Sequence, residues 1–331
     1  MIRHPVLLLS LFVSFLGALT LGLTLGAVGI PVGDVLAAFF GASDPEIETI
    51  VLSLRLPRVL LAAEVGAGLA VSGAVFQALL RNPLAEPYIL GVSSGAAVGA
   101  VVAIIFGMTV NSLFALPIAA FLGAVVAIIL VLGMASATGR GLDTHVLLLA
   151  GVVIGSFFNA IILLLVNFAD LETFRAAMLW MMGSFSGASW QGVSMVAVWV
   201  LPSLAVLTLL ARPLNLLSVG EQSAFHLGLD VRQLKFFLYI STSFLVGVCV
   251  AGSGAIGFVG LVVPHALRLV GGSDHRWLLP ACAMTGAGFL VFADTVARTV
   301  VAPAELPVGV VTALLGVPVF LWLLVRSEES V

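Results

Sequence analysis

Charged residues are scarce in this sequence. Of its 331 residues, 9% are Asp, Glu, Lys or Arg and 61% are hydrophobic, whereas a soluble domain carries about 25% charged residues. The mean hydropathy is +1.25. This composition excludes a soluble globular protein and predicts an all-α integral membrane protein. The net charge of −3 is too small to indicate a nucleic-acid partner.

Lysine and cysteine are almost absent. Lys235 is the only lysine and it follows Leu234, whereas the Walker P-loop requires Gly-Lys-Ser or Gly-Lys-Thr. The chain therefore cannot bind ATP in that way, and if ATP drives its work, a separate chain supplies the ATPase. Both cysteines, Cys249 and Cys282, lie in apolar runs, which is typical of small buried side chains and not of a disulfide.

Metal-ligand and catalytic patterns are also missing from the sequence. The five histidines show no metal-ligand spacing, and a metal ion requires clustered carboxylate, imidazole or thiolate groups. We therefore predict a protein that is not an enzyme, with no catalytic residues, no metal site and no cofactor.

Apolar stretches long enough to cross a bilayer recur along the chain. A hydrocarbon core about 30 Å thick needs about 20 helical residues. Ten such helices fit between the charged positions, with a turn at Asn111-Ser112 between the third and fourth and a short surface helix in the acidic connector after the first. The expected spans are 6–28, 58–80, 89–107, 114–137, 144–167, 191–211, 236–252, 257–270, 277–297 and 308–325.

The basic residues divide unequally between the two membrane faces that ten spans define. With the N-terminus in the cytoplasm, the inside ends hold Arg3, Arg81, Arg140, Arg212, Arg232, Lys235, Arg268, Arg276 and Arg326. The outside ends hold Arg55, Arg58, Arg175 and Arg298. Because short cytoplasmic loops are enriched in Lys and Arg, we predict a multi-pass inner (plasma) membrane protein with both termini in the cytoplasm.

Two glycine patterns match soluble-enzyme motifs in spacing only. Gly252-Ser253-Gly254-Ala255-Ile256-Gly257 fits G-x-G-x-x-G, but a dinucleotide site needs a βαβ unit around it, and here membrane spans flank it. Gly91-Val92-Ser93-Ser94-Gly95 fits the nucleophile elbow without a base nearby in sequence. We interpret the first pattern as a close-packed or broken helix and the second as a close helix–helix contact.

Two acidic residues, Glu64 and Asp294, fall inside predicted spans. Asp294 and Arg298 are four residues apart on one helical face, which favours a local ion pair. Ionisable groups in a membrane also mark ion pathways. An ion-coupled secondary transporter that uses Glu64 and Asp294 is therefore the alternative function.

Two further segments are too polar to face lipid. Arg81-Asn82-Pro83-Leu84-Ala85-Glu86-Pro87 contains two prolines four residues apart, which forbid a continuous helix there, so we place it at a membrane surface or a protected interface. The longest polar connector, 212–235, has apolar faces interrupted by Gly220 and Gly228. It predicts two short surface helices that dock a cytoplasmic partner.

Several long motifs together resemble one protein family. LRLPR, SGAVFQALLRNPLAEPYILGVSSGA, LNLLSVGEQSAFHLGL, GAIGFVGLVVPHALRL and AELPVGVVTALLGVPVF are similar to permease subunits of type II ABC importers, the FecCD-type family that takes up vitamin B12, haem and ferric siderophores. The resemblance covers nearly the whole chain. It implies a single transmembrane permease domain over 1–331, with about ten transmembrane helices and short surface coupling helices.

The resemblance also implies partners. It implies a homodimer with the translocation path at its two-fold axis, two ABC ATPase subunits on the cytoplasmic side, a periplasmic or lipid-anchored substrate-binding protein on the other side, and surrounding membrane lipid. ATP-driven closure of the two ATPases would move the coupling helices and switch the path between outward and inward access.

The family motifs assign roles to three groups of residues in this sequence. ATPase coupling falls on Leu217, Gly220, Glu221, Ala224, Leu227 and Gly228. Binding-protein docking falls on Arg55, Arg58 and Arg298, because arginine grips carboxylates with two hydrogen bonds. The cytoplasmic gate falls on Asn82, Leu84, Thr144 and His145, although His145 replaces the small polar residue expected there.

Overall fold

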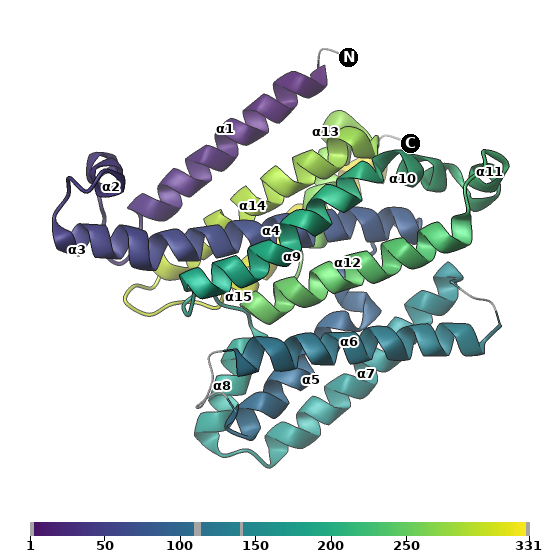
Figure 1. Cartoon of the computed structure of the whole chain (residues 1–331), viewed down its shortest axis with the longest axis horizontal. Coiled ribbons are helices and arrows are strands. Elements are labelled where there is room, and N and C mark those ends of the chain that lie inside the picture. Colours follow the sequence, from purple (N-terminus) through teal and green to yellow (C-terminus); the bar gives the residue numbers. More distant parts are fainter. Residues whose placement is uncertain (1–2, 109–113, 140–141, 329–331) are drawn as a thin grey trace.

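The computed structural model describes residues 3–108, 114–139 and 142–328, and every regular element within these ranges is a helix (Figure 1). The expected turn at Asn111-Ser112 and the inside-end residue Arg140 lie outside the described residues. The prediction of an all-α membrane fold is confirmed.

Seven helices of the described chain are long and apolar enough to cross a bilayer. They are α1 (Arg3–Thr24), α4 (Leu56–Leu79), α6 (Ala115–Ala137), α7 (Thr144–Asn167), α9 (Trp190–Leu209), α12 (Val231–Ser253) and α14 (His275–Thr299). Three further apolar helices are α5 (Val92–Ile105), α13 (Val259–Gly271) and α15 (Val308–Glu328). Each of these ten helices overlaps one of the ten expected spans.

Shorter elements connect these helices. They are α2 (Val32–Phe39), α3 (Pro45–Glu48), the π-helix η1 (Thr49–Arg55), the 3-10 helix η2 (Pro87–Leu90), α8 (Leu171–Met181), α10 (Ala211–Val219) and α11 (Glu221–His226). α2 confirms the surface helix expected in the acidic connector. α10 and α11 confirm the two helices expected in 212–235. α8 was not expected from the sequence.

α5 is shorter than its expected span 89–107, whereas α13 agrees with the short span expected over 257–270. α5 has 14 residues and rises about 21 Å, less than the bilayer core, because Gly91 with φ +77° separates it from η2. α13 has 13 residues and begins after a break between α12 and itself, where Gly254 has φ +72° and Phe258 has φ +70°. The G-x-G-x-x-G segment is therefore a broken helix, as predicted.

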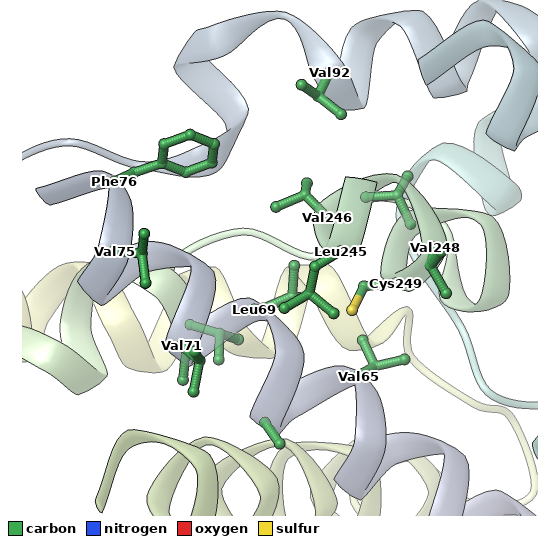
Figure 2. Packing of buried hydrophobic residues seen from close by; sticks show 14 of the residues in the cluster. Val65, Leu69, Val71, Val75, Phe76, Val92, Leu245, Val246, Val248 and Cys249 are labelled. Atoms are coloured by element: carbon green, nitrogen blue, oxygen red, sulfur yellow. The ribbon is translucent and has the colours of Figure 1, made fainter. Parts of the chain in front are cut away.

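α4 forms the centre of the bundle and is buried along most of its length. α1, α9, α12, α13 and α14 pack around it. Figure 2 shows Val65, Leu69 and Phe76 of α4 beside Leu245 and Cys249 of α12. The central position of α4 makes its first and last turns natural places for functional side chains, because the bundle holds both.

Glycines allow α4 to approach its neighbours backbone to backbone. A Cβ atom at Gly66 would overlap the carbonyl oxygen of Gly286 in α14, and one at Gly73 would overlap Gly260 in α13. Gly95 of α5 meets Gly123 of α6 in the same way, which confirms the predicted close helix contact in the nucleophile-elbow segment. Small residues at such contacts are the usual basis of helix packing in membranes.

The two ends of the bundle hold different elements. His4 near the N-terminus bonds the carbonyl oxygen of Gly271 at 3.0 Å and stacks on Trp277, and Figure 1 shows the C-terminus at the same end, near α10. We call this the α10 end; it holds the last turns of α4 and α13, the first turn of α14, and α10 and α11. The Arg58 end is opposite, where α4 begins and α14 finishes.

Candidate functional site

A cluster of charged side chains occupies the Arg58 end. The Arg58 guanidinium donates from Nε and Nη2 to both oxygens of Asp294, at 2.9 and 2.8 Å. It also donates from Nη1 and Nη2 to the two oxygens of Glu305, at 2.8 and 3.0 Å. The exposed fractions are 11% for Arg58, 1% for Asp294 and 39% for Glu305. Arg58 therefore holds one buried and one accessible carboxylate, each through two hydrogen bonds.

Arg298 lies beneath this cluster. Its Nε is 3.7 Å from Asp294 Oδ2, so the ion pair predicted from the four-residue spacing is confirmed, although Arg58 makes the shorter contact with the same acid. Arg298 Nη2 donates to the carbonyl oxygen of Gly22 in α1. The side chain of Arg298 is 6% exposed, so it supports the cluster from inside the protein.

Arg55 points toward the end of α1. Its Nη1 donates to the carbonyl oxygens of Leu23 and Thr24 at 2.7 and 2.9 Å, and its Nη2 donates to that of Val28. The carbonyls of Leu23 and Thr24 end α1 and lack the next intrahelical partner, and that of Val28 lies in the loop that follows. Arg55 therefore acts as a C-terminal cap for α1. All three arginines assigned to docking are largely covered by the protein. Arg55 and Arg298 are buried against carbonyls, and Arg58 lies just beneath the accessible carboxylate of Glu305.

Glu64, the second acid of the alternative function, lies two turns further into α4. Its Oε2 is buried without a hydrogen-bond partner among the described residues. The carboxylates that Arg58 holds are those of Asp294 and Glu305. The structure therefore gives Asp294 a structural role in an ion-pair cluster that does not include Glu64.

The α10 end carries the segment expected to couple to an ATPase. α10 buries Leu214 and Leu217, and Gly220 with φ +141° then turns the chain into α11. α11 buries Ala224. Apolar side chains nevertheless stay exposed on this segment: Val219 at 72%, Phe225 at 68% and Leu227 at 66%.

Two contacts position α11. Glu221 in its first turn forms an ion pair with Lys235 of α12 at 2.9 Å. At its other end Gly228, with φ +87°, lets the N–H of Leu229 donate to the carbonyl oxygen of Ala224 at 3.1 Å, a helix stop in the left-handed conformation. The single lysine of the chain thus fixes α11 against the start of α12.

A third contact at the α10 end is absent from the sequence predictions. Asn215 of α10 donates from Nδ2 to Asp274 Oδ1 at 2.7 Å, and its Oδ1 accepts from the His275 backbone N–H at 2.8 Å. Asp274 also caps α14 by accepting from the Arg276 N–H at 3.0 Å. Hydrogen bonds from the Arg276 side chain, and then from its backbone and Asn215, hold the pKa of Asp274 well below its usual value.

The residues assigned to the gate lie in two turns at the α10 end. Asn82 Oδ1 accepts from the Leu84 N–H at 2.9 Å, which closes the turn after α4, and Leu84 is 45% exposed. Thr144 and His145 open α7, where Asp143 Oδ1 accepts from the His145 N–H at 2.9 Å. Within the described parts of this single chain, no hydrogen bond or ion pair joins the two turns.

An apolar cavity of about 870 Å³ lies between α6, α9 and α12. Its lining includes Trp199 of α9 and Phe244 of α12, whose rings meet edge to face at 5.4 Å, and it reaches Glu305 at the Arg58 end. The side chains that line it offer apolar contact and a few hydroxyl groups. This cavity could not be predicted from the sequence, because its lining comes from segments far apart in the chain.

Comparison with known proteins identifies the family of this chain. A model of the FecCD transport family matches residues 11–326. The chain belongs to the FecCD transport family. Its relatives in that family include the vitamin B12 import system permease protein BtuC of Klebsiella pneumoniae, which is 46% identical over 97% of this chain and 94% of that protein. BtuC of Salmonella typhi is 47% identical over 97% of this chain and 95% of that protein.

Solved structures show the same FecCD fold. An inward-facing structure of a metal-chelate type ABC transporter is 34% identical, covers 97% of this chain and 99% of that chain, and superposes with a TM-score of 0.88. PsaBC from Streptococcus pneumoniae, bound to an Fab, superposes with a TM-score of 0.59 at 16% identity over 84% of this chain and 93% of that chain. This second likeness is one of fold alone.

Proposed function

We propose that this chain is the permease subunit of an ATP-driven importer of metal chelates, whose cargo is a cobalamin, haem or a ferric siderophore. The identity to permeases of vitamin B12 import, sustained over 97% of the chain, and the fold of a metal-chelate ABC transporter support this function. The chain performs no covalent chemistry; it forms the path, and a partner hydrolyses ATP.

The observation that carries this proposal is the exposed coupling segment α10–α11. Phe225 and Leu227 are more than 60% exposed on a short helix whose neighbours are fixed by Asn215 and Lys235. An apolar patch held on a rigid support is what a protein interface requires. The segment therefore serves as the contact with an ABC ATPase. Gly220, Glu221, Leu227 and Gly228 lie at its surface, whereas Leu217 and Ala224 are buried and hold the segment against the rest of the chain.

The assembly is a homodimer. Residues 1–331 form one transmembrane permease domain, two copies enclose the translocation path, and two ATPases bind at the α10 end. The protein lies in the inner membrane as a multi-pass protein surrounded by lipid, and both termini are cytoplasmic. The position of His4 beside Gly271 and Trp277 supports an N-terminus at the ATPase side.

A periplasmic or lipid-anchored substrate-binding protein docks at the Arg58 end. Arg58 has the direct role, because it lies beneath the accessible Glu305 and already binds that carboxylate through two hydrogen bonds. Arg55 and Arg298 have a supporting role, because their guanidinium groups hold the end of α1 and the Asp294 carboxylate in place.

Opening and closing of the path follows ATP binding. Closure of the two ATPases moves α10 and α11, and the turns that hold Asn82, Leu84, Thr144 and His145 at the same end change their separation in the dimer. The ordered turns after α4 and before α7 support this role, since each is fixed by a side chain that bonds the backbone.

An uptake assay tests the proposal. The chain is reconstituted into vesicles with its ATPase and binding protein, and uptake of cyanocobalamin, haemin and a ferric siderophore is measured with ATP, with ADP and with an ion gradient alone. We expect uptake of one chelate class with ATP only. Uptake that follows an ion gradient without ATP and is lost in Asp294→Asn would support the secondary transporter instead.

A further inference from the structure

α14 connects the two functional ends of this chain directly. It begins at His275, whose backbone N–H donates to Asn215 of α10 at 2.8 Å. Five residues before its last residue lies the Asp294 carboxylate that holds Arg58 at 2.8 Å. With 25 residues, α14 is about 37 Å long. One helix thus contacts both the coupling segment and the charged cluster at the opposite end.

α14 packs against the central helix α4. They meet backbone to backbone where Gly66 faces Gly286, and they are joined at the Arg58 end by the buried Arg58–Asp294 ion pair. A contact this close couples the two helices mechanically, because tightly packed interiors transmit strain. A movement of the first turn of α14 therefore reaches Arg58.

Asn215 is the polar contact between α10 and the first turn of α14. Its amide bonds two successive residues there: Nδ2 donates to Asp274 Oδ1 at 2.7 Å and Oδ1 accepts from the His275 N–H at 2.8 Å. The apolar contacts of Leu214 and Leu217 bury α10 but do not set its position along α14. The hydrogen bonds of Asn215 set that position, because hydrogen bonds are directional. α11 is attached elsewhere, to α12 through Glu221 and Lys235.

We propose that Asn215 is the positioning residue through which the ATPase-contacting helices and the binding-protein site at Arg58 affect each other, with α14 as the moving element. This inference rests on the proposed function. When the ATPases move α10, Asn215 carries Asp274 and His275 with it, and the far turn of α14 displaces Arg58 and Glu305. By linkage, docking at Arg58 changes nucleotide affinity by the same factor.

A ratio of two affinities tests this role. The full chain is purified together with its ATPase, and the binding protein that co-purifies is identified. The Kd of this binding protein for the complex is then measured with and without a non-hydrolysable ATP analogue. In the unsubstituted complex we expect the two values to differ about fivefold or more. Asn215→Ala should move their ratio about twofold or more toward one. A loss of stability alone lowers the amount of complex and leaves this ratio unchanged.

Matched variants isolate the contact. Ser218→Ala removes a hydroxyl from the same helix that bonds only its own turn, at Leu214, 2.8 Å away, and should keep the ratio of the unsubstituted complex. Asp274→Asn retains an acceptor oxygen for Asn215 and should largely keep the affinity ratio of the unsubstituted complex. Asp274→Ala removes that oxygen, and its ratio should move toward one. If Asn215→Ala yields no folded complex, the Asp274 pair decides the question.

Each outcome bears on the inference. An unchanged ratio in Asn215→Ala, or in Asp274→Ala where that pair decides, overturns the role of Asn215 and leaves the importer function standing. Equal affinities with and without nucleotide in the unsubstituted complex overturn it as well. A preparation without any P-loop ATPase overturns the proposed function and this inference together.

Discussion

Arg58 and Asp294 are 236 positions apart in the chain, yet the guanidinium of the first grips both carboxylate oxygens of the second. The pair joins the first turn of α4 to the last turns of α14 at the Arg58 end. Because Asp294 is 1% exposed, its charge depends on Arg58 and Arg298 for compensation. The contact is therefore both a structural tie and the base of the proposed docking site.

The two carboxylates that Arg58 binds, those of Asp294 and Glu305, should differ sharply in their effect on stability. Asp294→Ala leaves the buried Arg298 guanidinium without a carboxylate and Arg58 with Glu305 alone, and should lower the free energy of unfolding by about 3–5 kcal/mol. Glu305→Ala removes a carboxylate that is 39% exposed and should cost about 0–1 kcal/mol. Unfolding in mixed micelles measures both. Equal losses would contradict the distinction between a buried and an accessible partner.

Arg58 should dominate binding-protein docking. Arg58→Ala removes the guanidinium group beneath the accessible Glu305 and should weaken docking about tenfold or more, with a smaller salt dependence than the unsubstituted chain. Arg58→Lys should recover only part of the affinity, because an ammonium group cannot bind a carboxylate through a planar fork. Binding to the detergent-solubilised chain at two salt concentrations measures this.

Arg175 supplies the control for this experiment. It is an exposed arginine of α8 on the predicted outside face, so Arg175→Ala changes the net charge by the same amount. Docking that weakens equally in both variants would indicate a general charge effect and would contradict a specific site at Arg58.

The glycine contact between α4 and α14 should tolerate no methyl group. Gly66→Ala places a Cβ atom against the Gly286 backbone, so the helices must separate, at a cost of about 1–3 kcal/mol or more. Gly17→Ala in α1 meets nothing within 4 Å and should be neutral or slightly stabilising, since alanine favours a helix. Thermal unfolding of the two variants compares them; a stable Gly66→Ala protein would argue against backbone contact.

The exposed aromatic residue of α11 should matter for ATPase assembly and little for folding. Phe225 is 68% exposed, so Phe225→Ser removes few contacts within the chain but should weaken ATPase binding about tenfold or more if it is an interface anchor. Leu209 is 82% exposed at the end of α9, next to α10, and Leu209→Ser serves as the control. Co-purification yield at matched expression reports both; retention of the ATPase by Phe225→Ser would remove that residue from the interface.

Much of the fold could be predicted from the positions of charged and glycine residues. The ten helices follow from apolar runs bounded by charges, and the break near Gly254 and the close contact at Gly95 follow from small-residue spacing. The length of α5 did not follow, because hydropathy cannot show that the 3-10 helix η2 and the left-handed Gly91 delay the start of a helix inside an apolar run.

The candidate site was predictable only where its contacts are local. The pair Asp294–Arg298 has a four-residue spacing that sequence shows, whereas Glu305 on Arg58 and Asn215 on Asp274 join segments 247 and 59 positions apart. The burial of Arg55 depends on where α1 ends, since the carbonyls of Leu23, Thr24 and Val28 turn its side chain inward. A basic residue at a membrane end therefore does not reveal whether its charge is free.

The most direct test of the importer assignment is the composition of the native complex. The chain is purified from its own membrane in mild detergent, and mass spectrometry identifies and quantifies the proteins that remain bound. We predict a P-loop ATPase in equimolar amount, lost when Phe225 and Leu227 are both replaced by serine. A chain that purifies alone and still transports in vesicles without ATP would contradict the account.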